Sequence, residues 1–203
     1  MSIFEDTAPH AVRHEPLRVA ILGASGSVGM QTLDVCRHFP QKIEVVALAV
    51  RSSVEFAVKA ANEFNCKYVA FADESVKDNG LLDVLPQGCE TSFGSKAVQA
   101  LAELDEVDCV VNAVVGEAGI YAGLAAVKAG KVLAYANKES IVVGGDLLMP
   151  LVKPGQLIPV DSEHSAIFQC LVGEKLSDVS KIWLTCSGGP FFGKCREELA
   201  HVT

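Results

Sequence analysis

The sequence predicts an α/β fold: a Rossmann-like, doubly wound and mostly parallel sheet, followed by a truncated α/β segment of a second domain. Short β-rich runs are apolar on both faces, as at residues 19–22 and 45–48, which is typical of strands covered on both sides. Amphipathic helical stretches alternate with these runs, and such alternation builds right-handed βαβ units. A glycine-rich turn over residues 23–29 follows the first run directly and opens the first helix.

Individual elements follow from the same patterns. Strands are expected at residues 17–22, 43–50, 68–72, 109–115, 132–135, 157–160 and 181–185. Helices are expected at residues 28–39, 54–64, 95–104, 120–129 and 166–172, with Ser53 as the N-cap of the second. We interpret residues 1–16 as a flexible tail, residues 17–152 as the Rossmann-like domain and residues 153–203 as the incomplete start of a second domain, after a Lys-Pro-Gly joint.

The composition excludes several classes of protein. The chain has 203 residues, of which 50% are hydrophobic and 21% charged, so it can bury a sizeable core. Its net charge of −8 argues against binding nucleic acid or a membrane surface through bulk positive charge. No apolar run approaches the roughly 20 residues that span a bilayer. The seven cysteines are scattered singly without a C-x-x-C pair, which indicates reduced thiols in a cytoplasmic protein.

The turn over residues 23–29 has the pattern G-x-x-G-x-x-G between a strand and a helix. Glycines there let the backbone turn tightly and approach a pyrophosphate, whose charge meets free N–H groups at the helix N-terminus. This context favours dinucleotide binding. The alternative is a glycine turn that binds no ligand.

The end of the second strand predicts which dinucleotide binds. An NAD enzyme usually places an acid there to accept the ribose 2′-hydroxyl. This chain has Arg51, Ser52 and Ser53 instead, and a cation with two hydroxyls suits a 2′-phosphate. NADP is therefore favoured over NAD, with an ordinary solvated arginine as the alternative.

Two polar segments follow later strands. Residues 137–140, Asn-Lys-Glu-Ser, come after the strand at 132–135, where doubly wound folds bind ligands, and Lys138 offers a charge for an anionic substrate. A plain helix start, capped by Asn137 with Glu139 in its first turn, explains them equally well. Asp161 and Glu163 follow the strand at 157–160, and in extended geometry both carboxylates face the same way.

Two converging carboxylates repel unless they share a proton or a cation, and oxygen ligands favour Mg²⁺ or Mn²⁺. Further ligands must then come from substrate, water or residues outside this chain. We expect His164 to be a capping or supporting residue and not a ligand; a helix N-terminus carrying favourable acids is the alternative for the whole segment. Ser187 and the glycines after it offer a weak anion-binding pattern.

Together and in this order, the turn at 23–29 and the segments at 136–140, 159–164 and 187–191 resemble the 1-deoxy-D-xylulose 5-phosphate reductoisomerase family, from about Leu17 to the last residue. The resemblance implies cofactor contacts, substrate contacts and metal ligands. The NADPH-binding residues would be Gly23, Ser25, Gly26, Ser27, Val28, Arg51, Ser52, Ser53, Asn137 and Glu139. The sugar-phosphate substrate would meet Lys138, Ser162, Glu163 and Ser187, and the metal ligands would be Asp161 and Glu163. Lys138, Asp161 and Glu163 are the expected catalytic residues.

The family resemblance implies a reaction too. Family members use NADPH and Mg²⁺, Mn²⁺ or Co²⁺ to isomerise and reduce 1-deoxy-D-xylulose 5-phosphate to 2-C-methyl-D-erythritol 4-phosphate, in the methylerythritol phosphate route to isoprenoids. They are longer, homodimeric, bacterial cytoplasmic enzymes. We therefore expect this chain to be the cofactor domain plus the start of the catalytic domain, monomeric and inactive by itself. One departure is Arg51-Ser52-Ser53, where the family often has a glycine-containing turn.

Two other functions remain as alternatives. An aspartate-semialdehyde or acyl-phosphate dehydrogenase uses a similar glycine turn and NADPH, but it needs a cysteine nucleophile, and no cysteine of this chain has a convincing setting for one. Such an enzyme also leaves Asp161 and Glu163 without a role. The second alternative is a module that binds NADPH without chemistry.

Overall fold

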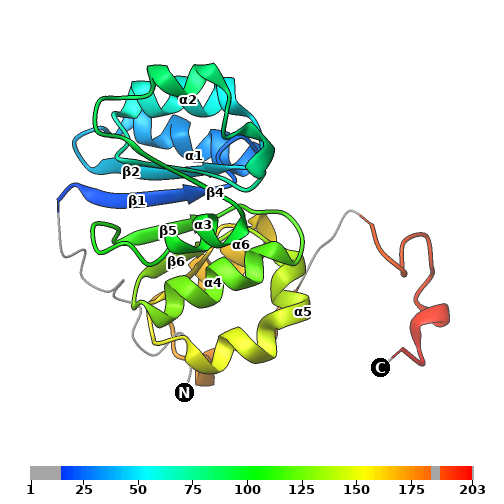
Figure 1. Cartoon of the computed structure of the whole chain (residues 1–203). Helices are drawn as coiled ribbons and strands as arrows, with labels where there is room; N and C mark the ends of the chain where they lie inside the picture. The colour runs from blue at the N-terminus through cyan, green and yellow to red at the C-terminus, as the bar shows by residue number, and fades with distance from the viewer. Residues whose placement is uncertain (1–14, 184–187, 203) are drawn as a thin grey trace.

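The computed structural model describes residues 15–183 and 188–202, and its body is a parallel sheet covered by helices on both faces (Figure 1). The strands are β1 (Leu17–Leu22), β2 (Ile43–Val50), β3 (Tyr68–Phe71), β4 (Glu90–Phe93), β5 (Cys109–Asn112), β6 (Val132–Tyr135) and β7 (Leu157–Pro159). The α-helices are α1 (Ser27–His38), α2 (Val54–Phe64), α3 (Ser95–Ala100), α4 (Ala118–Lys128), α5 (Lys138–Leu148) and α6 (Ser162–Leu171). Short 3₁₀ turns lie at Glu74–Val76, Gly80–Val84, Met149–Leu151, Leu176–Asp178 and Glu197–Leu199.

The strand order β4-β3-β2-β1-β5-β6-β7 confirms the doubly wound fold. Every pairing in this sheet is parallel, so the mostly parallel sheet of the prediction is a fully parallel one. The chain runs outward from β1 in one direction through β2 and in the other through β5. Ligands of such folds bind outside the carboxyl ends of the strands at this point of reversal.

The core lies on both faces of the sheet, because the central strands are apolar throughout. In β1, Val19 and Ile21 pack in the cluster under α1 and α2, whereas Ala20 and Leu22 pack in the cluster under α3, α4 and α5. Burying one such aliphatic side chain stabilises the fold by about 1.5–3 kcal/mol. The carboxyl end of β1 is therefore buried on both faces of the sheet.

The structure corrects several predicted strands. The strand expected at 109–115 ends at Asn112, because the chain turns away there into the loop that precedes α4. The edge strand β4 was not expected, since its sequence Glu-Thr-Ser-Phe is largely polar. Of the strand expected at 181–185, residues 181–183 are exposed and not in a strand, because no neighbouring strand pairs with them; residues 184 and 185 lie outside the described residues.

Some helices differ as well. The segment at 137–140 opens a full helix, α5, which the sequence left as one of two alternatives. The helix expected at 166–172 begins four residues earlier, at Ser162, because Asp161 caps it. Beyond the expected joint at 153–155, β7 pairs with β6 and continues the same sheet. The domain boundary itself stays a prediction.

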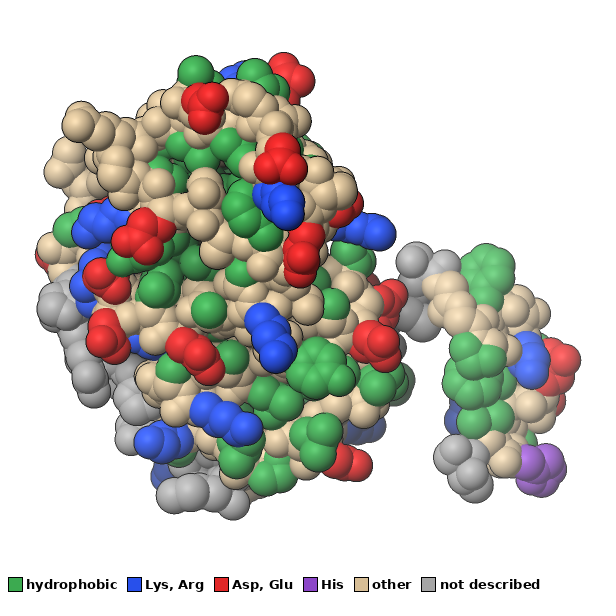
Figure 2. Space-filling model, viewed as in Figure 1, with side chains coloured by type: hydrophobic (Ala, Val, Ile, Leu, Met, Phe, Trp, Pro, Cys, Tyr) green, Lys and Arg blue, Asp and Glu red, His purple; other side chains and the backbone are tan. Residues whose placement is uncertain are grey.

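The surface carries both charged and apolar side chains. Figure 2 shows apolar side chains gathered among charged ones over α4 and α5, where Tyr121, Val142, Val143 and Leu147 are exposed. Among the described residues, no helix is both long and apolar enough to cross a membrane.

Candidate functional site

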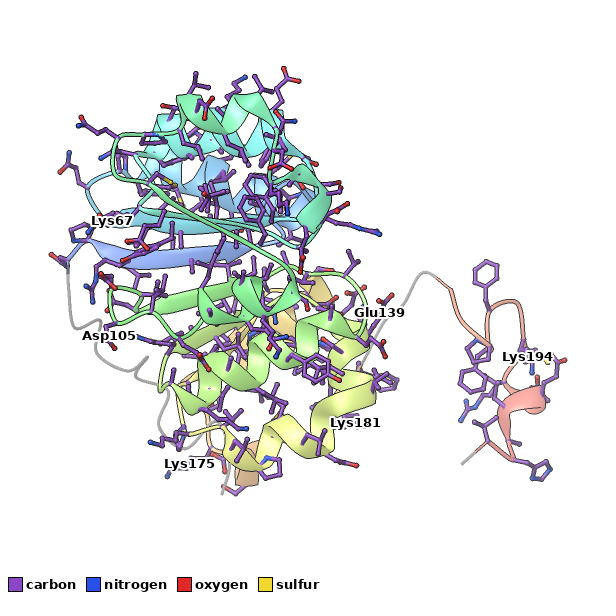
Figure 3. All side chains as sticks on the ribbon, viewed as in Figure 1. Lys67, Asp105, Glu139, Lys175, Lys181 and Lys194 are labelled. Atoms are coloured by element: carbon purple, nitrogen blue, oxygen red, sulfur yellow. The ribbon has the colours of Figure 1, made fainter. Side chains whose placement is uncertain are left out.

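A cavity of about 470 Å³ opens at the carboxyl ends of β1, β5 and β6. Its size lies in the range of small-molecule sites. Glu139, one of its lining residues, lies at the end of the molecule opposite Lys67 and Asp105, which precede β3 and β5 (Figure 3). The cavity is lined by Gly26, Ser27, Val28, Ala113, Val114, Val115, Ala136, Asn137, Lys138 and Glu139.

The glycine turn forms one wall of the cavity. Gly23 has φ +83°, and a Cβ there would lie 2.5 Å from the carbonyl oxygen of Ala113. A Cβ at Gly29 would lie 2.4 Å from the carbonyl oxygen of Gly23, so α1 packs directly on the turn. Both positions therefore require glycine for close backbone approach.

The N-terminus of α1 faces this cavity. Gly26 is its N-cap and supplies no side-chain acceptor, so the first N–H groups of the helix have no capping partner. Ser27 and Val28, the first helical residues, line the cavity. Free amides and the positive end of a helix dipole form a site suited to a phosphate group.

The opposite wall comes from the loop after β5, which was not predicted from the sequence. Ala113, Val114 and Val115 line the cavity, but their apolar sequence predicts a continuation of the strand. Asn112 was the available signal, because a fully buried polar residue at the end of an apolar strand needs partners.

Asn137 and Glu139 are both part of the site. Asn137 is the N-cap of α5, and its Oδ1 accepts a hydrogen bond from the Ser140 amide at 3.1 Å. Its Nδ2 donates to the carbonyl oxygens of Val114 and Gly116. The side chain thus ties α5 to the loop after β5, while exposed Glu139 stands in the first turn.

Lys138 brings the two acids of the predicted metal site together. Its Nζ lies 3.0 Å from Asp161 Oδ2 and 3.6 Å from Glu163 Oε2. Burial disfavours the charged form of Asp161, but hydrogen bonds from Lys138 and the His164 amide outweigh it and lower the pKa of this carboxyl. The hydrogen bond to Asp161 in turn raises the pKa of Lys138.

The carboxylates converge for a different reason than expected. The extended geometry stops at Asp161, which is the N-cap of α6 and accepts from the His164 amide at 3.4 Å, and Glu163 stands in the first helical turn. The two carboxylates lie close together because Asp161 caps α6 and Glu163 stands in the first turn of the same helix. The Ser162 hydroxyl donates to Glu163 Oε2 at 2.8 Å and is the largest cause that lowers the pKa of Glu163.

The chemistry of this donor set suits a divalent cation. Two carboxylates already share one cationic group, the Lys138 ammonium, and carboxylate oxygens are the ligands that Mg²⁺ prefers. Within residues 15–183 and 188–202, no group of three or more His, Cys, Asp or Glu side chains is placed to hold a metal. In the described part of the chain, the predicted metal ligands are thus limited to the two carboxylates of Asp161 and Glu163.

Residues 51–53 lie at the end of β2, beside the glycine turn. The amides of Gly23 and Ala24 donate to the carbonyl oxygen of Ala49, which holds the turn against β2. Arg51, Ser52 and Ser53 are exposed there and do not line the cavity. Ser53 takes the N-cap position of α2, as predicted, but its side chain makes no capping hydrogen bond.

The remaining predicted residues lie apart from the cavity lining or outside the description. Gly23 and Ser25 belong to the glycine turn but do not line the cavity. Ser162 is exposed at the start of α6, beside Glu163. Ser187 lies outside the described residues, so its predicted contact with a phosphate stays a prediction.

The parallel sheet and the glycine turn at the point of strand reversal define the class: a Rossmann-like α/β protein. A family model described as 1-deoxy-D-xylulose 5-phosphate reductoisomerase matches residues 19–145, and the model of that enzyme's C-terminal domain matches residues 157–203. The chain belongs to the 1-deoxy-D-xylulose 5-phosphate reductoisomerase family, which confirms the resemblance found in the sequence.

Known relatives agree with this assignment. The reductoisomerase of Thermoanaerobacter sp. is 47% identical over 188 residues, which cover 92% of this chain and 49% of the relative. The solved reductoisomerase of Zymomonas mobilis, in complex with NADPH, matches with a TM-score of 0.80 at 38% identity, over 93% of this chain and 50% of that one. A further reductoisomerase, solved with NADPH, fosmidomycin and magnesium, matches with a TM-score of 0.67 at 37% identity, over 76% of this chain and 38% of that one. The chain spans about half the length of the curated relatives it matches.

Proposed function

We propose that this chain binds NADPH as the cofactor domain of a 1-deoxy-D-xylulose 5-phosphate reductoisomerase. The observation that carries the proposal is the cavity between the glycine turn and α5, in a chain of this family. The turn residues Gly23, Ser25, Gly26, Ser27 and Val28 would hold the pyrophosphate through backbone amides at the start of α1. Asn137 and Glu139 would meet the cofactor from the opposite side.

Residues 51–53 would select NADPH over NADH. Their exposed guanidinium and hydroxyl groups follow the strand next to the glycine turn, where the adenosine ribose of a bound dinucleotide is expected. Arg51 would pair with the 2′-phosphate, a charge-assisted contact that NADH lacks.

We further propose that Asp161 and Glu163 hold the divalent cation, Mg²⁺, Mn²⁺ or Co²⁺. Lys138, Ser162, Glu163 and Ser187 would contact the sugar phosphate. When bound, the cation supplies Lewis acidity toward the ketose oxygens and NADPH supplies the hydride. Lys138 lines the cofactor cavity and contacts both carboxylates, so the substrate would lie between them.

The complete reaction is proposed only for a protein of the length of the curated relatives. Isomerisation and reduction of 1-deoxy-D-xylulose 5-phosphate to 2-C-methyl-D-erythritol 4-phosphate, homodimer formation and a place in the bacterial cytoplasm are proposed for that whole protein. This chain by itself is proposed to be monomeric. It is also proposed to be inactive, because two carboxylates alone make an incomplete cation site among the described residues. Product formation by this chain with Mn²⁺ and NADPH would contradict the proposed inactivity.

Calorimetric titration of the chain with NADPH and with NADH tests the cofactor assignment. We expect saturable binding with a preference for NADPH, and Arg51→Ala is expected to weaken NADPH binding about tenfold while leaving NADH binding unchanged. Lys67→Ala is the matched control, since it removes one positive charge just before β3, at the amino ends of the strands and away from the cavity. An equal affinity of the Arg51 variant and the wild type for NADPH would contradict the role of Arg51.

One more variant separates an enzyme from a module that binds NADPH without chemistry. Asp161→Asn in the full-length protein removes one proposed cation ligand and leaves the cofactor cavity intact. An enzyme of this kind loses turnover and keeps NADPH binding. Unchanged turnover would contradict the proposed cation site.

A further inference from the structure

Buried polar residues are concentrated behind the cofactor cavity. Within residues 15–183 and 188–202, four polar side chains are buried: Asn112, Asn137, Ser140 and Gln156. The first three gather at the carboxyl ends of β5 and β6. A buried amide or hydroxyl costs free energy unless it is hydrogen-bonded, so each of these side chains must have partners.

Asn112 is fully buried as the last residue of β5, and its side chain acts on both ends of the loop that follows. Its Nδ2 donates to the carbonyl oxygen of Gly119, in the first turn of α4, at 2.7 Å. Its Oδ1 accepts from the amide of Val114 at 3.4 Å. One side chain therefore fixes both the start of the loop and the helix at its end, and Ala113, Val114 and Val115 of this loop line the cavity.

At Gly119, α4 approaches the two amide side chains so closely that an added Cβ would force Asn137 to shift. A Cβ at Gly119 would lie 2.6 Å from Asn137 Nδ2 and 3.4 Å from Asn112 Oδ1. A Cβ at Gly123 would lie 3.0 Å from the Tyr135 ring. The backbone of α4 thus rests directly on Asn112 and its neighbours, and the position of the loop depends on them.

At the end of β6, the hydrogen bonds have one consistent donor-to-acceptor direction. The Ser140 hydroxyl donates to the carbonyl oxygen of Asn137 at 3.0 Å, so in its hydrogen bond with Tyr135 the phenol is the donor. Asn137 in turn donates to the carbonyl oxygens of Val114 and Gly116. Burial raises the pKa of Tyr135, which keeps this donor protonated at neutral pH.

We propose that Asn112 is a positioning residue for the dinucleotide: it sets the place of the 113–115 wall against the glycine turn. The inference rests on the proposed binding of NADPH. Asn112 does not line the cavity, so its action on the cofactor passes through the loop. The backbone of Gly23 lies against Ala113, so displacement of that wall also frees the glycine turn.

Gln156 provides the matched control. It is as buried as Asn112, and its Nε2 donates to the carbonyl oxygens of Val127 and Lys131 while its Oε1 accepts from the Lys153 amide. Its side-chain amide thus connects separate backbone segments, as that of Asn112 does. It lies just before β7, at the amino ends of the strands and away from the cavity. Loss of either amide side chain weakens the fold, but only one of them supports the cavity wall.

The experiment compares Asn112→Ala with Gln156→Ala by NADPH titration, thermal unfolding and hydrogen exchange. Both variants are expected to lower the midpoint of unfolding by several degrees. Only Asn112→Ala is expected to weaken NADPH binding, about ten- to a hundredfold, and to speed exchange of the Val114 amide. Asn112→Asp, which keeps the acceptor but loses the donor to Gly119, replaces it if the alanine variant does not fold.

The outcomes are distinguishable. If the wild-type chain does not bind NADPH, the proposed function fails and this inference fails with it. If the wild type binds and the Asn112 variant binds equally well, only the positioning role is overturned. Equal losses of affinity in the Asn112 and Gln156 variants would also overturn it, because general destabilisation would then explain both.

Discussion

Lys138 connects the two parts of the site. It lines the proposed cofactor cavity at the start of α5, and its ammonium contacts both carboxylates at the start of α6. An ammonium between two carboxylates uses the same oxygens that a divalent cation needs. Lys138 and the proposed cation would therefore compete for Asp161 and Glu163.

Removal of the ammonium should strengthen binding of the cation. We expect Lys138→Met to raise the affinity of the chain for Mn²⁺ about two- to fivefold, which is the effect of a partly exposed ion pair. The measurement is a Mn²⁺ titration followed by electron paramagnetic resonance. Lys128→Met, at the last turn of α4, changes the net charge equally and should leave the affinity unchanged. A lower affinity in the Lys138 variant would contradict the competition.

At the scale of residues, the sequence identified the polar half of the site better than the apolar half. The segments at 26–28 and 137–139, which carry glycines or charges next to strands, do line the cavity. Val114 and Val115 were missed, because an apolar side chain that lines a pocket has the same pattern as one in a strand. The convergence of Asp161 and Glu163 was expected, but the capping of α6 that causes it was not.

At the scale of elements, one cluster of side chains joins α1 and α2, the two helices that cover the same face of the sheet. Arg37 of α1 donates through its side chain to both carboxylate oxygens of Glu63 on α2, and its guanidinium lies 5.4 Å from the Phe64 ring centroid. The hydrogen bond from Arg37 is the largest cause that lowers the pKa of Glu63. The charged form of Glu63 therefore stabilises the folded state.

This pair predicts a pH-dependent difference in stability. Because the pKa of Glu63 is lower in the folded than in the unfolded chain, its stabilisation is complete above about pH 5 and is lost as the pH falls through the folded value. Glu63→Gln is expected to lower the free energy of unfolding by at most about 1 kcal/mol at pH 7, a limit set by solvent screening of an exposed pair. The difference should shrink toward pH 3.

Urea denaturation of both proteins across this pH range measures the difference. Glu103→Gln, which removes an exposed carboxylate after α3, controls for the change in net charge. A difference between wild type and Glu63→Gln that stays constant from pH 7 to pH 3 would contradict the assignment to the ion pair.

The strands differ in how well the sequence predicted their bounds. β1 and β2 have the predicted bounds, because strands buried on both faces need continuous apolar sequence. The apolar sequence after β5 was wrongly included in that strand, which ends at Asn112. β4 was missed because an edge strand that faces solvent tolerates the polar sequence Glu-Thr-Ser. α5 was left undecided, since Lys-Glu-Ser suits both a ligand loop and a helix start; the structure has the helix start, and ligand binding there stays a prediction.

At the scale of the whole molecule, the sheet and its helices form one body, and the last described segment lies apart from it. Residues 188–202, the orange and red segment in Figure 1, contain no buried residue. Phe191 and Phe192 are exposed there, as is Trp183 before it. β7, in contrast, is part of the sheet, and α6 packs on β7. Leu171 at the end of α6 is buried.

This contrast predicts where the folding unit ends. Deletion of residues 181–203 removes no buried side chain of the described residues, so the midpoint of thermal unfolding should stay within about 1 °C of that of the intact chain. NADPH affinity should be unchanged too, because the cavity lining ends at Glu139.

Deletion from residue 157 onward is the control: it removes β7 and uncovers β6, and it should lower the midpoint of thermal unfolding by many degrees. A large drop with the shorter deletion would mean that residues 181–203 pack on the body. Since Ser187 lies within that deletion, unchanged NADPH binding would also separate the cofactor site from its predicted phosphate contact.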